Sequence, residues 1–295
     1  MLDLISAYEN YLTKVKQASG NTVSSYIRDI RQFDRWLETN GEQKVLDADE
    51  LNIEGFLAHL QQEGRSAATV SRCLASLKNF YAYLVSTGFL AESPVTASIR
   101  VERGEKKLPQ ILSGAQVDKL LAQPVPVDPK GIRDKAMLEL LYATGIRVTE
   151  LIGLNVEDYN PDLKSIRVGE RNNSRAIPLY PAALRALSRY LTEIRASLIA
   201  DAGEKAMFVN VNGSRMSRQG FWKILKHYQA KAGIEQEITP HTLRHSFAVH
   251  LIENGAELSA VKELMGHKDI SSTQVYTHMI NQKVKTVYDK CHPKA

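Results

Sequence analysis

The sequence predicts a mainly α-helical protein of two domains, with one small antiparallel β-sheet in the second. Three observations predict this class. Apolar residues recur at three- and four-residue steps through most of the chain, strand-forming residues are confined to one short region, and a polar stretch between prolines interrupts the helical pattern near residue 100. The length of 295 residues also fits two domains, at about 100–200 residues per domain.

The first domain is expected at residues 1–92 and is predicted to be helical throughout. Its clearest helix begins near Ser19-Gly20-Asn21-Thr22, which are typical of a helix start, and ends at Asn40-Gly41. Two further helices are expected at about 49–63 and 67–86, because apolar residues recur there with helical spacing.

A linker is expected at residues 93–110. This stretch is polar and partly basic, and Pro94 and Pro109 bracket it. The second domain, expected at 111–295, then opens with a capping box at Ser113-Gly-Ala-Gln116.

The second domain is predicted to be mostly helical with one β-hairpin. Its two short strands are expected at Ser165-Ile-Arg-Val168 and Arg175-Ala-Ile-Pro-Leu179, because the turn formers of Gly169-Glu-Arg-Asn-Asn-Ser174 lie between them. Helices are expected at about 113–122, 130–143, 147–154, from Pro181 onward, and at about 217–231, 240–254, 258–265 and 272–290.

The positive charge belongs to the second part of the chain. The whole chain has 38 Lys and Arg against 33 Asp and Glu, a net charge of +5. Residues 1–100 hold 10 basic and 12 acidic side chains, which leaves 28 and 21 for residues 101–295. This bias is compatible with a polyanionic partner such as nucleic acid.

The compartment is expected to be the cytoplasm. Cys73 and Cys291 lie in no CxxC pair and are too few for a disulfide framework. The first ten residues carry acids where a signal peptide needs a basic flank. No uncharged stretch approaches the roughly 18–20 residues of a membrane span, so no membrane partner is expected.

One candidate phosphate site lies at the start of a helix that Thr239-Pro240 opens. His241 and Arg244 lie three residues apart, on one face of the first turn. Backbone N–H groups and the helix dipole favour an anion at this end. Taken alone, the pair is more typical of a solvated helix end.

A second candidate lies in Thr144-Gly-Ile-Arg-Val-Thr-Glu150. Gly145 is expected to end one helix, and Arg147 opens the next, where its guanidinium can present a planar fork to phosphoryl oxygens. Glu150, three residues on, could orient that guanidinium. Taken alone, this pattern is more typical of a surface ion pair.

A candidate nucleophile follows in the segment that begins at Met265-Gly-His267. Tyr276 lies nine residues after His267, close to the start of a short helix capped by Ser271-Ser-Thr273. A core position is the commoner role of a single tyrosine. A phenol with a pKa near 10 attacks at neutral pH only where nearby cations favour the phenolate. The cations available are Arg147, Arg244, His241 and His267.

Together these blocks resemble the tyrosine recombinases of the phage integrase family, and within it the Xer subfamily. The resemblance covers nearly the whole chain. It rests on the order and spacing of Asn21–Leu37, Ala143-Thr-Gly-Ile-Arg-Val-Thr-Glu-Leu151, His241-Thr-Leu-Arg-His-Ser-Phe247, Gly266-His267, Tyr276-Thr-His278 and the terminal His292-Pro-Lys-Ala295.

The resemblance implies roles for these residues. Arg147 and Arg244 would clamp the non-bridging oxygens of the scissile phosphate. His241 and His267 would assist by hydrogen bonding and proton transfer. Tyr276 would attack phosphorus and form a 3′-phosphotyrosyl link, which conserves the bond energy, so neither a metal nor another cofactor is expected.

The hairpin departs from the family pattern. The family usually places a lysine there, as in Gly-Lys-Gly-Asn-Lys-Glu-Arg, to protonate the leaving 5′-oxygen. Here Glu170 occupies the lysine position and Arg171 follows it. Arg171 is a candidate to assist at the same oxygen, although a guanidinium is a poor proton donor at neutral pH. Three alternatives stay open: the hairpin shifts register, another group protonates the 5′-oxygen, or the reaction is slowed.

The resemblance also implies an architecture and partners. The first domain would be a four-helix, SAM-like core-binding domain that clamps duplex DNA through a local face such as Arg65, Arg72 and Lys78. The second would be the α-rich catalytic domain. Four protomers, alone or with a sister Xer recombinase, would assemble on two DNA sites to resolve chromosome dimers at a terminus site, with a DNA translocase as a further partner.

The residue patterns alone are also compatible with three other functions. A metal-dependent hydrolase would use His241, His245 and His250, but the segment lacks the glutamate of an HExxH site. A DNA-binding protein that kept the fold and lost turnover is conceivable because of Glu170. A type IB topoisomerase shares the chemistry, but the compact first domain favours a recombinase.

Overall fold

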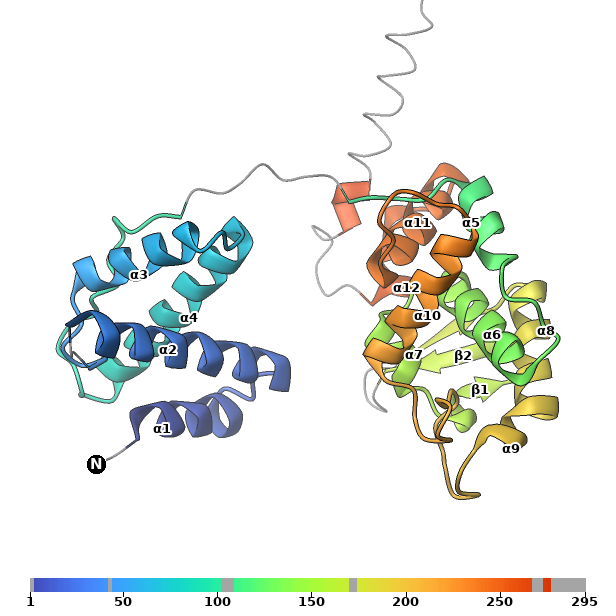
Figure 1. Ribbon diagram of the computed structural model, residues 1–295, viewed down its shortest axis with the longest axis horizontal. Coiled ribbons are helices and arrows are strands. Elements are labelled where there is room, and N and C mark those ends of the chain that lie inside the picture. The colour runs from blue at the N-terminus through green and yellow to red at the C-terminus, as the bar shows by residue number, and fades with distance from the viewer. Residues whose placement is uncertain (1–2, 42–43, 102–108, 170–173, 267–272, 277–295) are drawn as a thin grey trace, which may run out of the picture. The chain divides into compact units, whose positions relative to one another are not determined.

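The computed structural model describes residues 3–41, 44–101, 109–169, 174–266 and 273–276. The chain forms two compact units, Met1–Lys107 and Leu108–Ala295, and each has its own hydrophobic core (Figure 1). In the part of the chain with described structure, no helix has both the length and the apolar character needed to cross a membrane.

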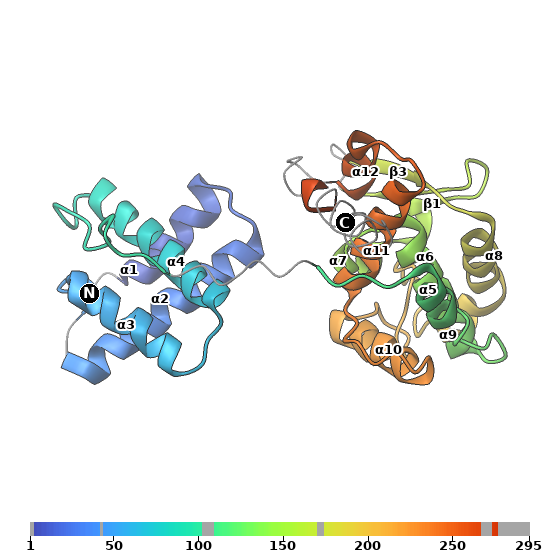
Figure 2. The same ribbon diagram turned by 90° about the horizontal axis from the view of Figure 1, so that it is seen from above.

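The first unit is a bundle of helices around an aromatic core. α4 packs along α2 and also contacts α3 (Figure 2). Phe33, Phe56 and Phe80 are fully buried between these helices. The helices are α1 (Leu4–Asn10), which continues as a π-helical turn at Tyr11–Val15, α2 (Gly20–Gly41), α3 (Glu50–Gln62) and α4 (Ala67–Ser86).

A buried carboxylate ties two of these helices together. Asp29 of α2 is 1% exposed, and it accepts hydrogen bonds from the Arg72 guanidinium and, at 2.8 Å, from the Ser76 hydroxyl. Buried charges are tolerated when they are paired and hydrogen-bonded in this way. Arg72, which the sequence suggested for a DNA-facing surface, therefore serves at least partly to neutralise Asp29.

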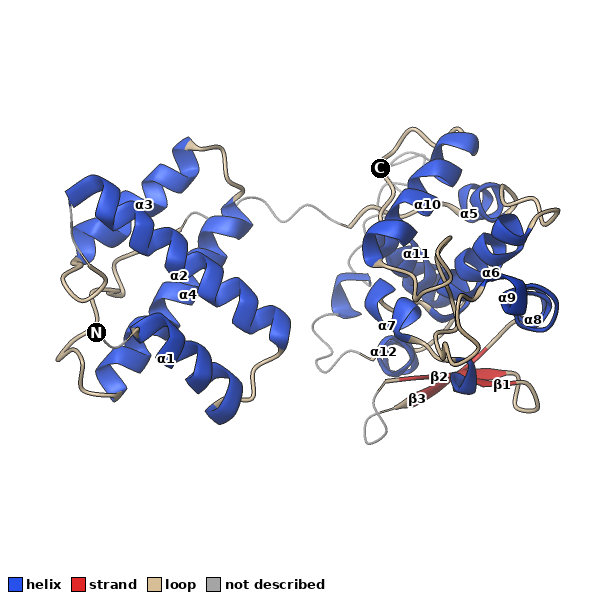
Figure 3. Cartoon of the chain, turned by 60° about the horizontal axis from the view of Figure 1, so that its bottom comes forward, coloured by secondary structure: helices blue, strands red, loops and turns tan. Residues whose placement is uncertain are grey.

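The second unit is mostly helical, as predicted. Helices gather on one face of a small sheet, which lies along one side of the unit (Figure 3). Residues 273–276 are also helical. The helices are α5 (Gly114–Leu121), α6 (Pro129–Thr144), α7 (Val148–Gly153), α8 (Pro181–Arg189), α9 (Arg195–Leu198), α10 (Arg218–Lys231), α11 (Pro240–Glu253) and α12 (Leu258–Met265).

The sheet has three antiparallel strands in the order β1 (Tyr159–Asn160), β2 (Ser165–Val168) and β3 (Arg175–Pro178). β2 and β3 pair with Val168 opposite Arg175, so Arg175 is the first residue of β3 beyond the hairpin loop. The predicted hairpin is present. β1 was not predicted, because its two residues are too short to show an alternating pattern.

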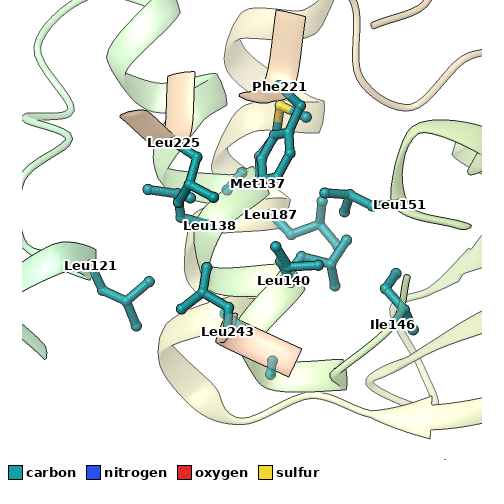
Figure 4. Packing of buried hydrophobic residues seen from close by; sticks show 14 of the residues in the cluster. Leu121, Met137, Leu138, Leu140, Ile146, Leu151, Leu187, Phe221, Leu225 and Leu243 are labelled. Atoms are coloured by element: carbon teal, nitrogen blue, oxygen red, sulfur yellow. The ribbon is translucent and has the colours of Figure 1, made fainter. Parts of the chain in front are cut away.

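α6 is the central helix of the second unit. It contacts α5, α7, α8 and α11, and most of its residues are buried. Met137, Leu138 and Leu140 pack against side chains from α8, α10 and α11, including Leu187, Phe221, Leu225 and Leu243 (Figure 4). This packing fixes the C-terminal end of α6, where the residues with candidate chemistry begin.

Candidate active site

The turn between α6 and α7 is shaped by Gly145. This residue ends α6 with a φ of +58°, a left-handed conformation that costs a residue with a Cβ about 1–2 kcal/mol. A Cβ at this position would also lie 2.2 Å from Cδ1 of Phe247 on α11. The chain therefore needs glycine here, and the turn brings Arg147 to the beginning of α7.

Arg147 is the N-cap residue of α7, and Glu150 holds it in place. The backbone N–H of Arg147 donates to Oε2 of Glu150 at 2.7 Å, and Nη1 of Arg147 lies 3.6 Å from Oε1. The Arg147 side chain is 42% exposed, so its guanidinium is accessible to a ligand.

Glu150 is also bonded to Arg175, the first residue of β3. Nη1 of Arg175 donates to Oε1 of Glu150 at 3.0 Å. Burial alone would raise the pKa of the Glu150 carboxyl, but the hydrogen bonds from Arg175 and Arg147 and the charges of both outweigh it. The pKa of Glu150 consequently lies below its ordinary value, and the carboxylate stays ionised.

Arg244 lies deeper in the site than Arg147. It is 3% exposed, and it donates from Nη1 to the Gly145 carbonyl at 2.6 Å and from Nη2 to the Met265 carbonyl at 2.7 Å. Burial, followed by the positive charge of Arg147, lowers the pKa of the Arg244 guanidinium to about 10, so it remains charged at neutral pH.

His241 lies one turn before Arg244 on α11 and is exposed at the surface. Thr239 caps this helix through its side chain, which accepts from the backbone N–H of Thr242. Partial loss of water around the ring, followed by the charges of Arg244, Arg147 and Arg218, lowers the pKa of His241. The imidazole is therefore mostly neutral at neutral pH, and it can donate from one ring nitrogen and accept at the other.

Tyr276 lies against α11 and α12 and is 1% exposed. Its hydroxyl is 2.8 Å from Nδ1 of His245. Burial raises the pKa of the Tyr276 phenol, and the charges of Arg244 and Arg147 oppose that rise. The phenol is thus protonated at neutral pH and needs a base if it is to attack.

The structure gathers most of the residues that the sequence singled out. They lie where the ends of α6 and α12 approach the starts of α7 and α11, and the charge of Arg147 influences the pKa of each of the others. These residues are Arg147, Glu150, His241, Arg244 and Tyr276. His267 and the hairpin residues Glu170 and Arg171 lie outside the described residues.

Sequence reasoning missed two members of this cluster. His245 was considered only as a metal ligand, although its place four residues after His241 puts it on nearly the same helix face. Arg175 received no role, although it closes the hairpin block Gly169–Arg175. Its importance depends on contacts with Glu150 and Leu264, which the sequence does not reveal.

In the metal-site alternative, the ring centroids of His241 and His245 are 6.2 Å apart, but two of the three histidines are engaged by tyrosines. His245 is bonded to Tyr276, and Nδ1 of His250 is 2.9 Å from the hydroxyl of Tyr142. Within the described ranges, no three His, Cys, Asp or Glu side chains are grouped as metal ligands would be.

The arrangement is suited to an anion with a nucleophile beside it. Two guanidiniums, from Arg147 and Arg244, and the start of α11 provide positive charge and N–H donors. Glu150 is already neutralised between Arg147 and Arg175, so its charge repels an incoming phosphate only weakly. A phenol with a histidine partner completes the set.

Comparisons with known proteins agree over both units. Residues 110–283 match the phage integrase family, and residues 5–88 match the phage integrase N-terminal SAM-like domain. Tyrosine recombinase XerD of Staphylococcus epidermidis is 40% identical over 296 residues, which cover 100% of both chains. XerD of Oceanobacillus iheyensis is 43% identical over 295 residues, which cover 99% of this chain and 98% of that one.

Solved structures share the fold at lower identity. The XerH site-specific recombinase has a TM-score of 0.76 and 21% identity, over 96% of this chain and 83% of that one. Lambda integrase, residues 75–356, has a TM-score of 0.72 and 19% identity, over 94% of both chains. The predicted fold class and family are confirmed: the chain belongs to the phage integrase family, among its XerD-like tyrosine recombinases.

Proposed function

We propose that this recombinase cuts and rejoins duplex DNA at a specific site, with Tyr276 as the nucleophile and Arg147 and Arg244 as the phosphate clamp. The observation that carries this assignment is the convergence of both arginines, His241 and Tyr276 at one place in the second unit. Arg244 donates to the Gly145 carbonyl two residues before Arg147, and the His245 ring centroid lies 6.2 Å from that of His241 and 5.6 Å from that of Tyr276. Of the described residues, both arginines, His241 and Tyr276 combine a nucleophile with the positive charge that a phosphodiester requires.

The proposed step conserves the phosphodiester energy. The Tyr276 oxygen attacks phosphorus, the bond from phosphorus to the 5′-oxygen breaks, and a 3′-phosphotyrosyl link forms. His245 lies at hydrogen-bond distance from the phenol and can take its proton. The leaving 5′-oxygen takes a proton from water or from a hairpin side chain such as Arg171, and attack by a 5′-hydroxyl then reverses the step on either strand.

Both arginines act on the charge of the transition state. Phosphorus passes through a pentacoordinate arrangement whose equatorial oxygens carry the negative charge, and fixed guanidiniums stabilise that charge without reorganising. Neutral His241 can add one hydrogen bond to the same oxygens. His267 keeps the assisting role that the family resemblance implies.

Several relatives support DNA as the partner. XerH has been solved bound to a difH substrate in pre-cleavage and post-cleavage complexes, and lambda integrase as a dimer on a core site. We place residues 1–92 as a DNA-clamping domain and residues 111–295 as the catalytic domain, joined by 93–110. Four protomers, identical or paired with a sister recombinase, would act at a dif-like terminus site to resolve chromosome dimers, with a DNA translocase as the regulator.

Covalent attachment to a nicked DNA site tests the mechanism. A nick beside the scissile phosphate lets the cleaved fragment diffuse away and traps the protein–DNA adduct. We expect an adduct from the parent and none from Tyr276→Phe, which removes only the attacking oxygen. Tyr159→Phe is the matched control and should keep the adduct, because its hydroxyl bonds Ser188 outside the site, at 3.0 Å.

Each result has a distinct meaning. An equal adduct from Tyr276→Phe contradicts the choice of nucleophile. DNA binding by the parent without any adduct, on every candidate terminus site, supports instead a DNA-binding protein that has lost turnover. Loss of the parent adduct in a chelator such as EDTA contradicts the metal-independent chemistry.

A further inference from the structure

Arg175 joins three segments of the second unit through one guanidinium. It begins β3, immediately after the hairpin loop, and its side chain is only 18% exposed. Nη1 donates to Glu150 at 3.0 Å, and Nε donates to the Leu264 carbonyl in the last turn of α12 at 2.7 Å. The hairpin, the start of α7 and the end of α12 are thereby held together.

We propose that Arg175 is a positioning residue for strand cleavage, which holds Arg147 through Glu150 and the C-terminal end of α12 through the Leu264 carbonyl. The inference rests on the proposed cleavage function and adds a residue to it. Arg175 acts through other groups: two of its three nitrogens are bonded to protein, and the third is buried.

The first part of the argument concerns Arg147. Glu150 accepts the Arg147 backbone N–H and lies beside its guanidinium. Glu150 can do this well only as a carboxylate, yet its burial opposes ionisation. The Arg175 hydrogen bond and charge counter that burial, so removal of Arg175 weakens the hold of Glu150 on Arg147.

The second part concerns the end of α12. Its last turn offers two successive carbonyls, Leu264 to Arg175 and Met265 to Arg244. Cations are favoured at this end of a helix, where carbonyls lack intrahelical partners. The two arginines thus fix the point from which the chain runs on to His267 and Tyr276.

Close packing at Gly266 adds an independent observation. This residue ends α12 with a φ of +62°, and a Cβ there would lie 2.7 Å from Nη1 and 2.9 Å from Cζ of Arg175. The guanidinium therefore packs directly over the backbone that precedes His267. A shorter or displaced cation at residue 175 would leave this contact unfilled.

The third nitrogen of the Arg175 guanidinium indicates that Arg175 does not serve stability alone. Nη2 of Arg175 is buried and has no hydrogen-bond partner in the described part of the chain. An unsatisfied buried donor lowers stability, especially on a charged group. The planar fork, which reaches a carboxylate and a carbonyl on different segments, is what this site gains from arginine.

The test uses the full chain and single-turnover attachment to nicked DNA at saturating protein. Arg175→Met removes the charge and the fork but keeps an unbranched apolar side chain. We expect attachment to slow by about 10²-fold, the size of effect that misplacing a catalytic group produces. Affinity for the DNA should change by less than about threefold, because the Arg175 side chain is only 18% exposed and Nε and Nη1 are bonded to protein groups.

Two further variants separate positioning from general damage. Arg175→Lys keeps the charge but cannot bond both Glu150 and the Leu264 carbonyl, so its rate should fall between parent and Arg175→Met. Arg189→Met is the control, because Arg189 at the end of α8 also pairs with a glutamate, Glu193, but both side chains are exposed. It should match the parent.

A modified substrate reports on Arg147 itself. Replacing one non-bridging oxygen of the scissile phosphate by a methyl group removes the charge that Arg147 neutralises. On this substrate, Arg175→Met should form the adduct at a rate within about fivefold of the parent rate. In a Glu150→Gln background, Arg175→Met should slow attachment by a smaller factor than it does in the parent, because both substitutions disturb the contact between Glu150 and Arg175.

The outcomes distinguish the two proposals. If the parent forms no Tyr276 adduct, the cleavage function itself fails. If the parent forms the adduct and Arg175→Met cleaves at the parent rate, only the positioning role fails. The part of the role that passes through Glu150 to Arg147 is overturned if Arg175→Met is slow by the same factor on the methyl-substituted substrate, because the defect then does not pass through Arg147.

Discussion

The Tyr276 side chain is buried although the proposed reaction requires its oxygen at a DNA phosphate. It packs among Phe247, Val261 and Met265, and its hydroxyl is bonded to His245. A phenol with a raised pKa in apolar surroundings is a poor nucleophile. Unbound protein in this arrangement should therefore be slow to react with water or stray phosphates.

His241 gives a pH dependence whose sign follows from its surroundings. Its pKa is lower in the folded protein than in the unfolded chain, so the unfolded chain binds more protons in the range between the two values. The resulting stability is fully present above the unfolded pKa and is lost as the pH falls through the folded pKa. His241→Gln should therefore show a smaller fall in the melting temperature of the second unit than the parent, between about pH 7.5 and about pH 5.

Thermal unfolding at both pH values provides the measurement, and His59→Gln in the first unit is the control. Equal pH dependence in the parent and His241→Gln would contradict the lowered pKa.

At the level of elements, the end of α6 sets the geometry of the site. Gly145 is required for its left-handed φ and for its closeness to Phe247, and its carbonyl receives Arg244. We expect Gly145→Ala to destabilise the second unit by about 2–4 kcal/mol, from the backbone conformation and the overlap together. Chemical denaturation measures the change.

Phe247→Leu provides the partner for a double-mutant cycle. A smaller side chain relieves the overlap but not the backbone strain, so Gly145→Ala should cost less in that background, by about 1 kcal/mol. Independent, additive effects would show that the Phe247 contact is unimportant.

Local signals predicted most elements, and tertiary contacts formed the rest. Ser113, Thr239 and Gly145 mark helix ends through caps or a left-handed conformation, and the structure places helix ends at all three. The π-helical turns at Tyr11–Val15 and Tyr190–Ile194 carry no comparable mark.

The site residues divide in the same way, into those that local sequence signals predict and those that only tertiary contacts reveal. Arg147, Arg244, His241 and Tyr276 lie in recognisable blocks. His245 and Arg175 gain importance only from partners 31 and 89 residues away along the chain, Tyr276 and Leu264. No local pattern predicts such pairs.

At the level of the whole molecule, the chain has two cores and an uneven charge. Residues 1–100 carry more acidic than basic side chains, and residues 101–295 carry the excess of basic ones. Binding that neutralises about six phosphates should weaken by about 10³-fold between roughly 50 and 200 mM salt. We expect most of this dependence to come from the second unit.

Salt titrations of non-specific duplex binding test this expectation. The full chain should be compared with fragments 1–101 and 109–295, each first checked for a cooperative unfolding transition. The expectation fails if fragment 1–101 shows a salt dependence as steep as that of fragment 109–295.

The contacts at the end of α12 are made by main-chain oxygens, and this affects which sequence changes the site can accept. Another apolar side chain at Leu264 or Met265 leaves the carbonyls that receive Arg175 and Arg244 in place. One residue inserted within α12 would instead turn those carbonyls by about 100° and shift them by about 1.5 Å. The length of this helix is therefore under tighter constraint than the identity of its residues. Redesign of this region should use substitutions and avoid insertions and deletions.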